Sequence, residues 1–239
     1  MSASNAGRVG VWGASGSGKS SYVKQRIASA RRVVILDPLQ EYPGFKHVHS
    51  VDDVRQAMRA DWSGFRVALV PRAGQEAKTL SALSRLLIRA QAPYRGKKRG
   101  KLLTLVVEEM NTCFPVAGGA AKCPGFAEIC SRGRHSWIEA VGVSQRIAEV
   151  DTRFRGNCTE TVVFRQKGPR DRKAAADELG CRPSDLPNEN LSYVIEKAGG
   201  ISRGQVTFGK PANDNRAPAS NTNREPIRKG NRKKPKFPT

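Results

Sequence analysis

The segment from Gly13 to Ser20, GASGSGKS, has the residue types and the spacing of a phosphate-binding loop. It fits the pattern G-x-x-x-x-G-K-[ST], follows an apolar run and precedes a stretch of helical character, which is the context that this motif requires. Glycines allow successive backbone N–H groups to curl around an anion, and the start of the following helix adds partial positive charge. We therefore expect the chain to bind the phosphates of a nucleotide.

Each position of this loop has an expected role. The residues predicted to surround the phosphates are Gly13, Ala14, Ser15, Gly16, Ser17, Gly18, Lys19, Ser20 and Ser21. Lys19 should reach the β- and γ-phosphates, and the Ser20 hydroxyl should be a ligand of Mg²⁺. A Gly/Ser-rich turn that matches the pattern by chance is the alternative, and the flanking elements disfavour it. ATP and Mg²⁺ are the predicted cofactors.

Two adjacent carboxylates, Glu108 and Glu109, end the apolar run LLTLVV. A buried strand that ends in acids places them at the sheet edge where the ligand of a phosphate-binding loop lies. One carboxylate can hold Mg²⁺ through water, and its neighbour can orient and deprotonate an attacking water. The second acid favours hydrolysis over transfer to an acceptor, whereas an ordinary solvated strand end is the alternative interpretation.

Polar residues further along the chain extend this pattern. Gln145 follows the apolar run AVGVS, and its amide can sense the γ-phosphate or position a water. Five arginines can stabilise charge on a transferring phosphoryl group in the same subunit or in a neighbour: Arg132, Arg134, Arg146, Arg153 and Arg155. Contact with a DNA backbone or a solvated surface is an equally good interpretation of each arginine. The residues alone therefore do not assign the catalytic arginine.

Strands and helices are expected to alternate along the chain and to position these groups. Apolar runs predict strands at 8–12, 32–37, 65–70, 102–109, 139–145 and 159–166. Helical periodicity or capping predicts helices at 19–29, 50–60, 76–90, 124–135 and 171–179. This alternation is typical of a parallel sheet covered by helices. Residues 191–208 predict a hairpin that turns at Gly199-Gly200.

The charge balance is strongly positive, with 42 Lys and Arg against 21 Asp and Glu in 239 residues. A chain this basic should bind a polyanion, for which nucleic acid is a better candidate than an anionic membrane surface. The segment YRGKKRGK at 94–101 is a candidate DNA-facing loop, with a solubilising charge run as the alternative. We predict one domain at 1–209 and a basic, disordered tail at 210–239, which has almost no large apolar residue.

The first residues do not have the pattern of a secretory signal, and no stretch reaches the length of apolar sequence that a membrane helix needs. The five cysteines include no CxxC pair, so a zinc site is disfavoured and reduced thiols are expected. These features predict a soluble, cytoplasmic protein.

In this order, the motifs resemble the HerA/FtsK superfamily of ring-forming DNA-translocating ATPases, especially the compact genome-packaging ATPases of internal-membrane viruses with double-jelly-roll capsids. The resemblance runs from about Arg8 to Gln166 and depends on GASGSGKS, VVILDPLQEYPG, LLTLVVEE and SRGRHSWIEAVGVSQRIAEVDTRFRGN. It implies an α/β fold of the P-loop NTPase, RecA/ASCE-like type, with a mostly parallel sheet flanked by helices. The C-terminal hairpin and the disordered basic tail would follow this fold.

The resemblance also implies a role for single residues. Glu108 matches the Walker B acid that helps to hold Mg²⁺, although Asp is usual there, and Glu109 matches the catalytic base. Gln145 matches the polar sensor. Arg134, with Arg132 as the nearby alternative, matches the arginine that acts on the nucleotide of a neighbouring subunit. The family's DP-x-x-E-Y segment, here 37–42, is expected to be structural or to lie beside the nucleotide.

For the whole protein, the resemblance implies an ATP-driven translocase of double-stranded DNA that works as a homo-oligomeric ring. Packaging of a viral genome into a procapsid is the favoured form, with sequence-nonspecific DNA and a capsid portal or vertex protein as partners. Location would then be the host cytoplasm or the packaging vertex of the virion. A cellular or conjugation-type translocase and an ATP-switched DNA-binding regulator are the alternatives. Paired acids and Gln145 count against the regulator.

Overall fold

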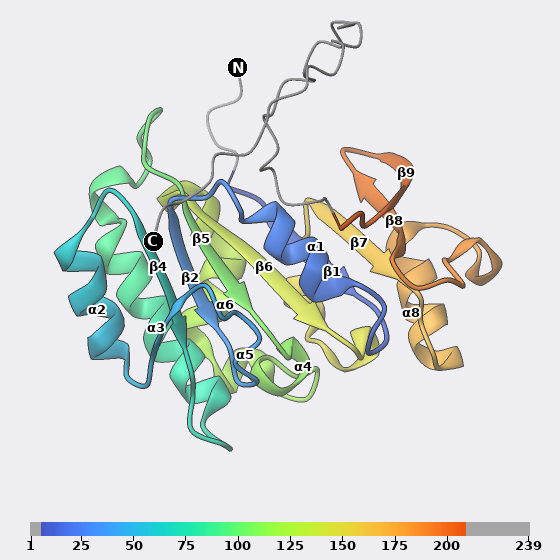
Figure 1. Cartoon of the computed structure of the whole chain (residues 1–239), viewed down its shortest axis with the longest axis horizontal. Helices are drawn as coiled ribbons and strands as arrows, with labels where there is room; N and C mark the ends of the chain where they lie inside the picture. The colour runs from blue at the N-terminus through green and yellow to red at the C-terminus, as the bar shows by residue number, and fades with distance from the viewer. Residues whose placement is uncertain (1–5, 209–239) are drawn as a thin grey trace, which may run out of the picture. The chain divides into compact units, whose positions relative to one another are not determined.

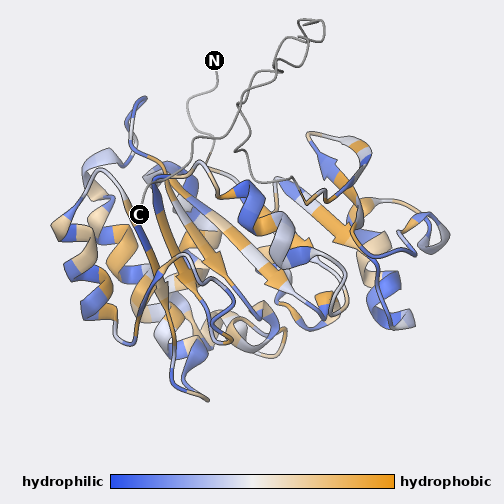
Figure 2. Cartoon of the chain, in the orientation of Figure 1, coloured by the Kyte–Doolittle hydropathy of each residue, from blue (hydrophilic) through white to orange (hydrophobic). Residues whose placement is uncertain are grey.

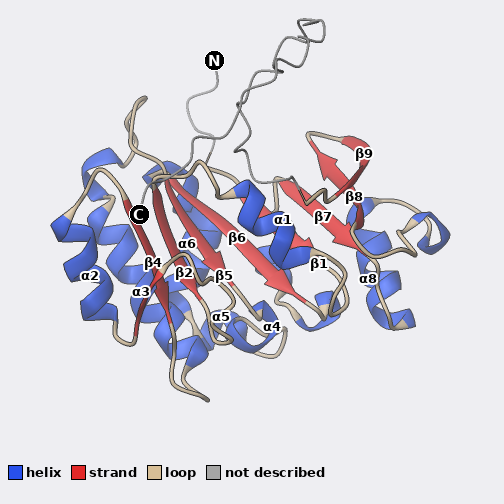
Figure 3. Ribbon diagram, in the orientation of Figure 1, coloured by secondary structure: helices blue, strands red, loops and turns tan. Residues whose placement is uncertain are grey.

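The computed structural model describes residues 6–208, and in this part nine strands form a single sheet in the order β3-β4-β2-β5-β6-β1-β7-β8-β9 (Figure 3). Strands β1 to β7 run parallel, and β8 and β9 add to the β7 edge in antiparallel orientation. The strands are β1 (Arg8–Trp12), β2 (Arg32–Leu36), β3 (Lys46–Val48), β4 (Phe65–Leu69), β5 (Leu103–Val107), β6 (Ile138–Ser144), β7 (Glu160–Phe164), β8 (Ser192–Lys197) and β9 (Gly200–Gln205). The predicted mostly parallel α/β sheet with a C-terminal hairpin is therefore confirmed.

Helices cover both faces of this sheet (Figure 1). One face packs against α1, and the other packs against α2, α3, α6 and α8. The α-helices are α1 (Lys19–Arg26), α2 (Val51–Ala60), α3 (Glu76–Ala90), α4 (Met110–Cys113), α5 (Gly119–Lys122), α6 (Pro124–Arg132), α7 (Thr152–Arg155) and α8 (Pro169–Leu179). Short 3-10 helices are η1 (Ala92–Tyr94), η2 (Gly133–Ser136), η3 (Ile147–Glu149) and η4 (Pro183–Asp185).

The central strands are mostly apolar, as Figure 2 shows, and β1, β2 and β7 each begin with a buried charged residue, Arg8, Arg32 and Glu160. All residues of β1, β2, β5 and β7 are buried. Alternate residues point to opposite faces, so Val11 packs with α1 whereas Trp12 packs in the core under α3 and α6. Continuous apolar strands are expected where a parallel sheet is covered on both sides. They hold the strand ends, and hence the polar residues that follow them, in fixed positions.

Two glycines that pair across β1 and β6 make room for large side chains beneath the site. A Cβ on Gly10 would lie 2.4 Å from the ring of Trp12, and one on Gly142 would lie 2.3 Å from Cε of Met110. The rings of Trp12 and Phe154 meet edge to face at 6.2 Å. This cluster packs behind the strand ends from which the phosphate-binding loop and α4 begin.

Most predicted elements are present with small changes at their ends. Helix α3 spans the predicted residues, whereas α1 ends at Arg26 and β3 was missed, because three residues at a sheet edge give little pattern. The hairpin turns at Ala198-Gly199, one residue before the predicted glycine pair. Both turn residues have positive φ, 53° and 79°, as a two-residue hairpin of this type requires. The domain boundary at 209/210 remains a prediction, because residues 210–239 lie outside the described residues.

Candidate nucleotide-binding and hydrolysis site

The phosphate-binding loop lies between the carboxyl ends of three strands. It connects β1 to α1, and β6 and β7 flank β1 in the sheet. Gly13 N donates to Ser144 O at 3.2 Å, and Ala14 N donates to Arg165 O at 2.8 Å. Leu191 N donates to Ser17 O at 2.8 Å from the segment before β8. The backbone of the loop is thus fixed by both neighbouring strands.

The glycines of this loop permit its shape. Gly16 and Gly18 have φ of 69° and 111°, in the left-handed region that favours glycine. A Cβ on Gly13 would lie 2.6 Å from Ser17 Oγ and 2.6 Å from Phe164 Cβ. Ser17 Oγ is buried and has no hydrogen-bond partner within the described part of the chain. A tight glycine loop with an unsatisfied buried hydroxyl fits a bound phosphate group.

Lys19 is a buried cation at the start of α1. Its Nζ donates to Ala14 O at 3.1 Å, and none of the ion pairs found within residues 6–208 includes it. Burial lowers the pKa of Lys19, and the carboxylates of Glu108, Glu109 and Glu41 act in the opposite direction. An ammonium group that is buried near acids without an ion pair is suited to binding a polyphosphate.

The segment 37–42 brings two side chains onto the residues predicted for Mg²⁺. Ser20 Oγ donates to Glu41 Oε2 at 2.6 Å. The Tyr42 hydroxyl donates to Glu108 Oε1 in a short hydrogen bond. Asp37, fully buried at the end of β2, accepts from the backbone N–H groups of Glu41 (3.0 Å) and Tyr42 (3.3 Å). The segment, expected to be structural or to lie beside the nucleotide, thus contacts both residues that were predicted to bind Mg²⁺.

Glu108 is a buried acid whose charge is poorly compensated. Burial raises the pKa of Glu108 from its ordinary value of 4.5 to about 7. The hydrogen bond from Tyr42 and the nearby charge of Lys19 lower this pKa, whereas Glu41 and Asp37 raise it. Carboxylate and hydroxyl oxygens, completed by phosphate oxygens and water, are the ligands that Mg²⁺ takes. The donors present at Glu108 and Ser20 therefore fit this cation.

Glu109 and Gln145 meet at the carboxyl edge of the sheet. They follow the adjacent strands β5 and β6, and Gln145 Nε2 donates to Glu109 Oε1 at 3.2 Å. Glu109 is half-buried and has a φ of 49°, which is uncommon for a residue other than glycine. Beside them, Ser144 Oγ donates to Asn111 Oδ1 at 2.8 Å. Glu108 accepts a hydrogen bond from Tyr42 and Glu109 accepts one from Gln145, so the two acids have different partners.

The structure places Arg132 and Arg134 at the opposite edge of the sheet. They lie at the end of α6 and in η2, before the amino end of β6, whereas Gln145 follows its carboxyl end. A strand of seven residues is about 20 Å long. Both arginine residues are exposed. The phosphate-binding loop and these arginines therefore do not meet within one chain.

Two of the other candidate arginines connect the chain after β6 to α8. Arg146 forms ion pairs with Asp171 (2.8 Å) and Glu149 (3.0 Å). Arg155 forms an ion pair with Glu178 at 2.5 Å. Arg146 and Arg155 therefore both pair with acids of their own chain, and the catalytic role considered for them stays a prediction.

Sequence reasoning missed Tyr42 and Asn111. The available signal for Tyr42 was its place in the DP-x-x-E-Y segment, directly after a strand. Its contact with Glu108 depends on β2 and β5 being neighbours in the sheet, and this strand order is not readable from the sequence. Asn111 follows the paired acids by two positions, but nothing in its spacing connects it to Ser144.

Comparisons with solved structures identify similar folds. The genome packaging NTPase B204 from Sulfolobus turreted icosahedral virus 2, in complex with ATP-gammaS, is 15% identical with a TM-score of 0.69, over 87% of this chain and 100% of that chain. The pCW3 conjugation coupling protein TcpA, a monomer form with ATPgS, is 15% identical with a TM-score of 0.58, over 84% of this chain and 60% of that chain. The cytoplasmic domain of the type VII secretion ATPase EccC of Thermomonospora curvata is 15% identical with a TM-score of 0.60, over 84% of this chain and 25% of that chain.

No protein-family model matches the sequence, and no curated protein matches it significantly. Identities of this size establish the fold alone. The chain shares the fold of these NTPase and ATPase structures, which confirms the P-loop NTPase fold expected from the motifs.

Proposed function

We propose that this protein is an ATPase that couples ATP hydrolysis to the movement of double-stranded DNA. The observation that carries the proposal is the convergence at one sheet edge of Lys19 in a glycine loop, the buried acid Glu108, and Glu109 hydrogen-bonded to Gln145. An efficient base beside the loop favours hydrolysis, because a nucleotide-dependent switch does not need one.

In this proposal, each group at the edge performs one task. Lys19 and the loop amides hold the β- and γ-phosphates, and Mg²⁺ bound by Ser20 and Glu108 would neutralise their charge. Glu109 orients the attacking water and accepts its proton. Gln145 fixes the Glu109 carboxylate through the 3.2 Å hydrogen bond between Nε2 and Oε1.

Double-stranded DNA is the proposed polyanion. The net charge of +21 suits contacts to phosphates that carry no sequence information. The basic loop at 94–101 lies at the amino edge of the sheet, before β5, and Gly96 N donates to His135 O in η2 at 2.9 Å. This loop and the adjacent arginines at 132 and 134 thus form one basic region, at the opposite edge from the phosphate-binding loop.

Viral genome packaging is the specific form that we favour, with a capsid portal or vertex protein as docking partner. The fold similarity to B204, with a TM-score of 0.69 against 0.58 for TcpA, supports this choice. A conjugation-type translocase is the second candidate, and the fold similarity to TcpA supports it. No helix within residues 6–208 is both long and apolar enough to cross a membrane.

The decisive experiment measures ATPase rate with and without duplex DNA, together with native mass. Lys19→Ala should abolish ATP binding, whereas Glu109→Gln should keep binding and stop hydrolysis. A wild-type monomer whose ATPase rate ignores DNA would refute the translocase proposal, and an active Glu109→Gln protein would refute the assignment of the base.

A ring is proposed because Arg134 cannot serve the nucleotide of its own chain. Arg134→Ala and Glu109→Gln subunits should each be inactive alone. Mixing them should restore hydrolysis, because an intact base then faces an intact arginine across an interface. In the matched control, Arg132→Ala subunits are mixed with Glu109→Gln subunits in place of Arg134→Ala subunits. Absence of recovery in rings that native mass shows to be mixed would contradict the role of Arg134 in a neighbouring site.

A further inference from the structure

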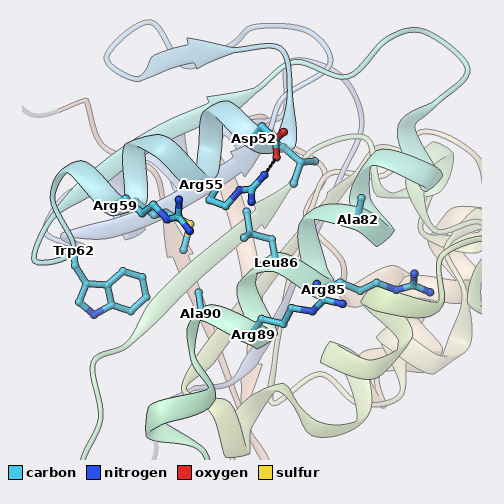
Figure 4. Close-up of a pocket in the computed structure, with 11 residues that line it drawn as sticks. Asp52, Arg55, Arg59, Trp62, Ala82, Arg85, Leu86, Arg89 and Ala90 are labelled. Atoms are coloured by element: carbon cyan, nitrogen blue, oxygen red, sulfur yellow. Dashed lines mark hydrogen bonds and ion pairs between the residues drawn. The ribbon is translucent and has the colours of Figure 1, made fainter.

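A groove of about 810 Å³ lies between α2 and α3, and its character differs from that of the nucleotide site. Its floor is apolar: Met58 is buried, and Val51, Leu86 and Ala90 are partly buried. Figure 4 shows Leu86 and Ala90 between the two helices, with Trp62 at one end of the groove. The floor offers apolar surface that a bound side chain can cover.

Four arginines surround this floor. Arg55 and Arg59 are four residues apart on α2, and Arg85 and Arg89 are four residues apart on α3, so each pair lies on one side of its helix (Figure 4). All four are exposed. Asp52 is the single acid among the lining residues, and it pairs with Arg55. The groove therefore presents an excess of positive charge around an apolar centre.

The charge of the groove decides between its possible occupants. The segment 210–239 contains two acids and nine Lys or Arg residues, so it would be repelled. A second copy of this chain, with 42 basic and 21 acidic residues, is a poorer match for the charge of this groove than an acidic segment is, and the proposed ring would use other faces of the chain. Duplex DNA would satisfy the arginines but would leave the apolar floor uncovered, because its outer surface is a phosphate backbone. A segment with apolar side chains flanked by acids satisfies both parts of the groove.

We propose that the groove between α2 and α3 is a docking site for an acidic, amphipathic segment of a different protein. Leucine-like or aromatic side chains of that segment cover Val51 and Leu86, and its carboxylates pair with the arginines, above all Arg59 and Arg89. Arginine at such rims can bind a carboxylate through two parallel hydrogen bonds.

The position of the groove keeps it apart from the nucleotide site. Strand β4, which leads into α3, is four places from β1 in the sheet, or about 19 Å at the spacing of neighbouring strands. A docked segment therefore leaves the phosphate-binding loop open. The proposed binding does not depend on the proposed function. If that function holds, the partner would be the protein to which the DNA motor is anchored, and this identification rests on the proposed function.

The test uses selection from a displayed library of random 12-residue peptides against the full-length protein, with counter-selection against the Arg59→Glu/Arg89→Glu variant. Enriched peptides should combine at least two acids with at least two large apolar residues. Affinities of the synthetic peptides, measured by fluorescence anisotropy, should fall at least tenfold for Arg59→Glu/Arg89→Glu.

Two further variants separate groove binding from general attraction to a basic protein. Arg72→Glu/Lys78→Glu makes the same change of charge at exposed positions outside the groove and should alter affinity less than twofold. Ala82→Trp keeps the charge and fills the groove at an exposed position, so it should also weaken binding at least tenfold. Basal ATPase activity, with or without DNA, should be unchanged in all three variants.

Failure to enrich peptides over the counter-selection would overturn the proposal, as would equal loss of binding in the groove variant and the Arg72→Glu/Lys78→Glu control. A 20-base-pair duplex that loses tenfold affinity for Arg59→Glu/Arg89→Glu, with peptide binding unaffected, would assign the groove to DNA instead. If the wild-type protein has no ATPase activity, the proposed function is refuted, whereas the result for peptide binding still holds.

Discussion

The contact between Tyr42 and Glu108 allows us to predict how the free energy of unfolding changes with pH. Glu108 has a pKa of about 7 in the folded chain, against an ordinary value of 4.5. Between these values the folded state binds more protons than the unfolded state, so stability falls as the pH rises. The difference in pKa corresponds to about 3 kcal/mol of stability lost between the two pH values.

Tyr42→Phe removes the hydroxyl that donates to Glu108. A hydrogen bond to a neutral group contributes about 1 kcal/mol, and one to a charged group about 2 kcal/mol. The substitution should therefore be more costly at pH 9, where Glu108 is ionised, than at pH 5, where it is protonated. This difference of about 1 kcal/mol corresponds to a rise of slightly under one unit in the pKa of Glu108.

The assay is urea unfolding of the metal-free protein, in EDTA, at pH 5 to 9. It compares wild type, Tyr42→Phe, Glu108→Gln and the double variant, so that other titrating groups cancel. The cost of Tyr42→Phe should increase with pH in the wild-type background and stay constant in the Glu108→Gln background. A cost that is the same at pH 5 and pH 9 in both backgrounds would refute the argument that Tyr42 stabilises the charged form of Glu108.

Three other predictions follow from close contacts at the site. Gly13→Ala places a Cβ 2.6 Å from Ser17 Oγ and should weaken ATP binding at least tenfold by calorimetry, whereas Gly44→Ala, with open space around it, should leave binding unchanged. Gly142→Ala would place a Cβ against Met110 Cε and should lower the free energy of unfolding by about 1–3 kcal/mol in urea titration; an unchanged midpoint would contradict the packing argument. Gln145→Ala should lower the ATPase kcat at least tenfold without changing ATP affinity, and an unaltered kcat would remove its role beside Glu109.

The parts that could be predicted from the sequence are those that depend on local pattern. The glycine loop, helix α3 and the order of the parallel strands along the chain follow from short-range spacing and apolar periodicity. The place of Arg134 also follows, because a single strand separates it from Gln145. Parallel strands put the start and the end of such a segment at opposite sheet edges.

The parts that could not be predicted depend on which strands are neighbours. Tyr42 reaches Glu108 because β2 lies beside β5, although many residues separate them along the chain. The arginine groove has the same origin: the spacing of Arg55 and Arg59, or of Arg85 and Arg89, is visible in the sequence. Their convergence requires α2 and α3 to lie side by side on one face, which only the tertiary structure reveals.

The placement of Arg134 and Lys19 at the two ends of the sheet has a consequence for free subunits, if Arg134 acts as we propose. A subunit in isolation can then hold ATP but hydrolyses it slowly, so idle copies in the cell do not deplete the nucleotide pool. Diluting the protein would then lower the ATPase rate per subunit, and this rate would report what fraction of subunits has a neighbour in place. Because β6 separates Arg134 from the nucleotide site of its own chain, ATP hydrolysis would thus depend on assembly.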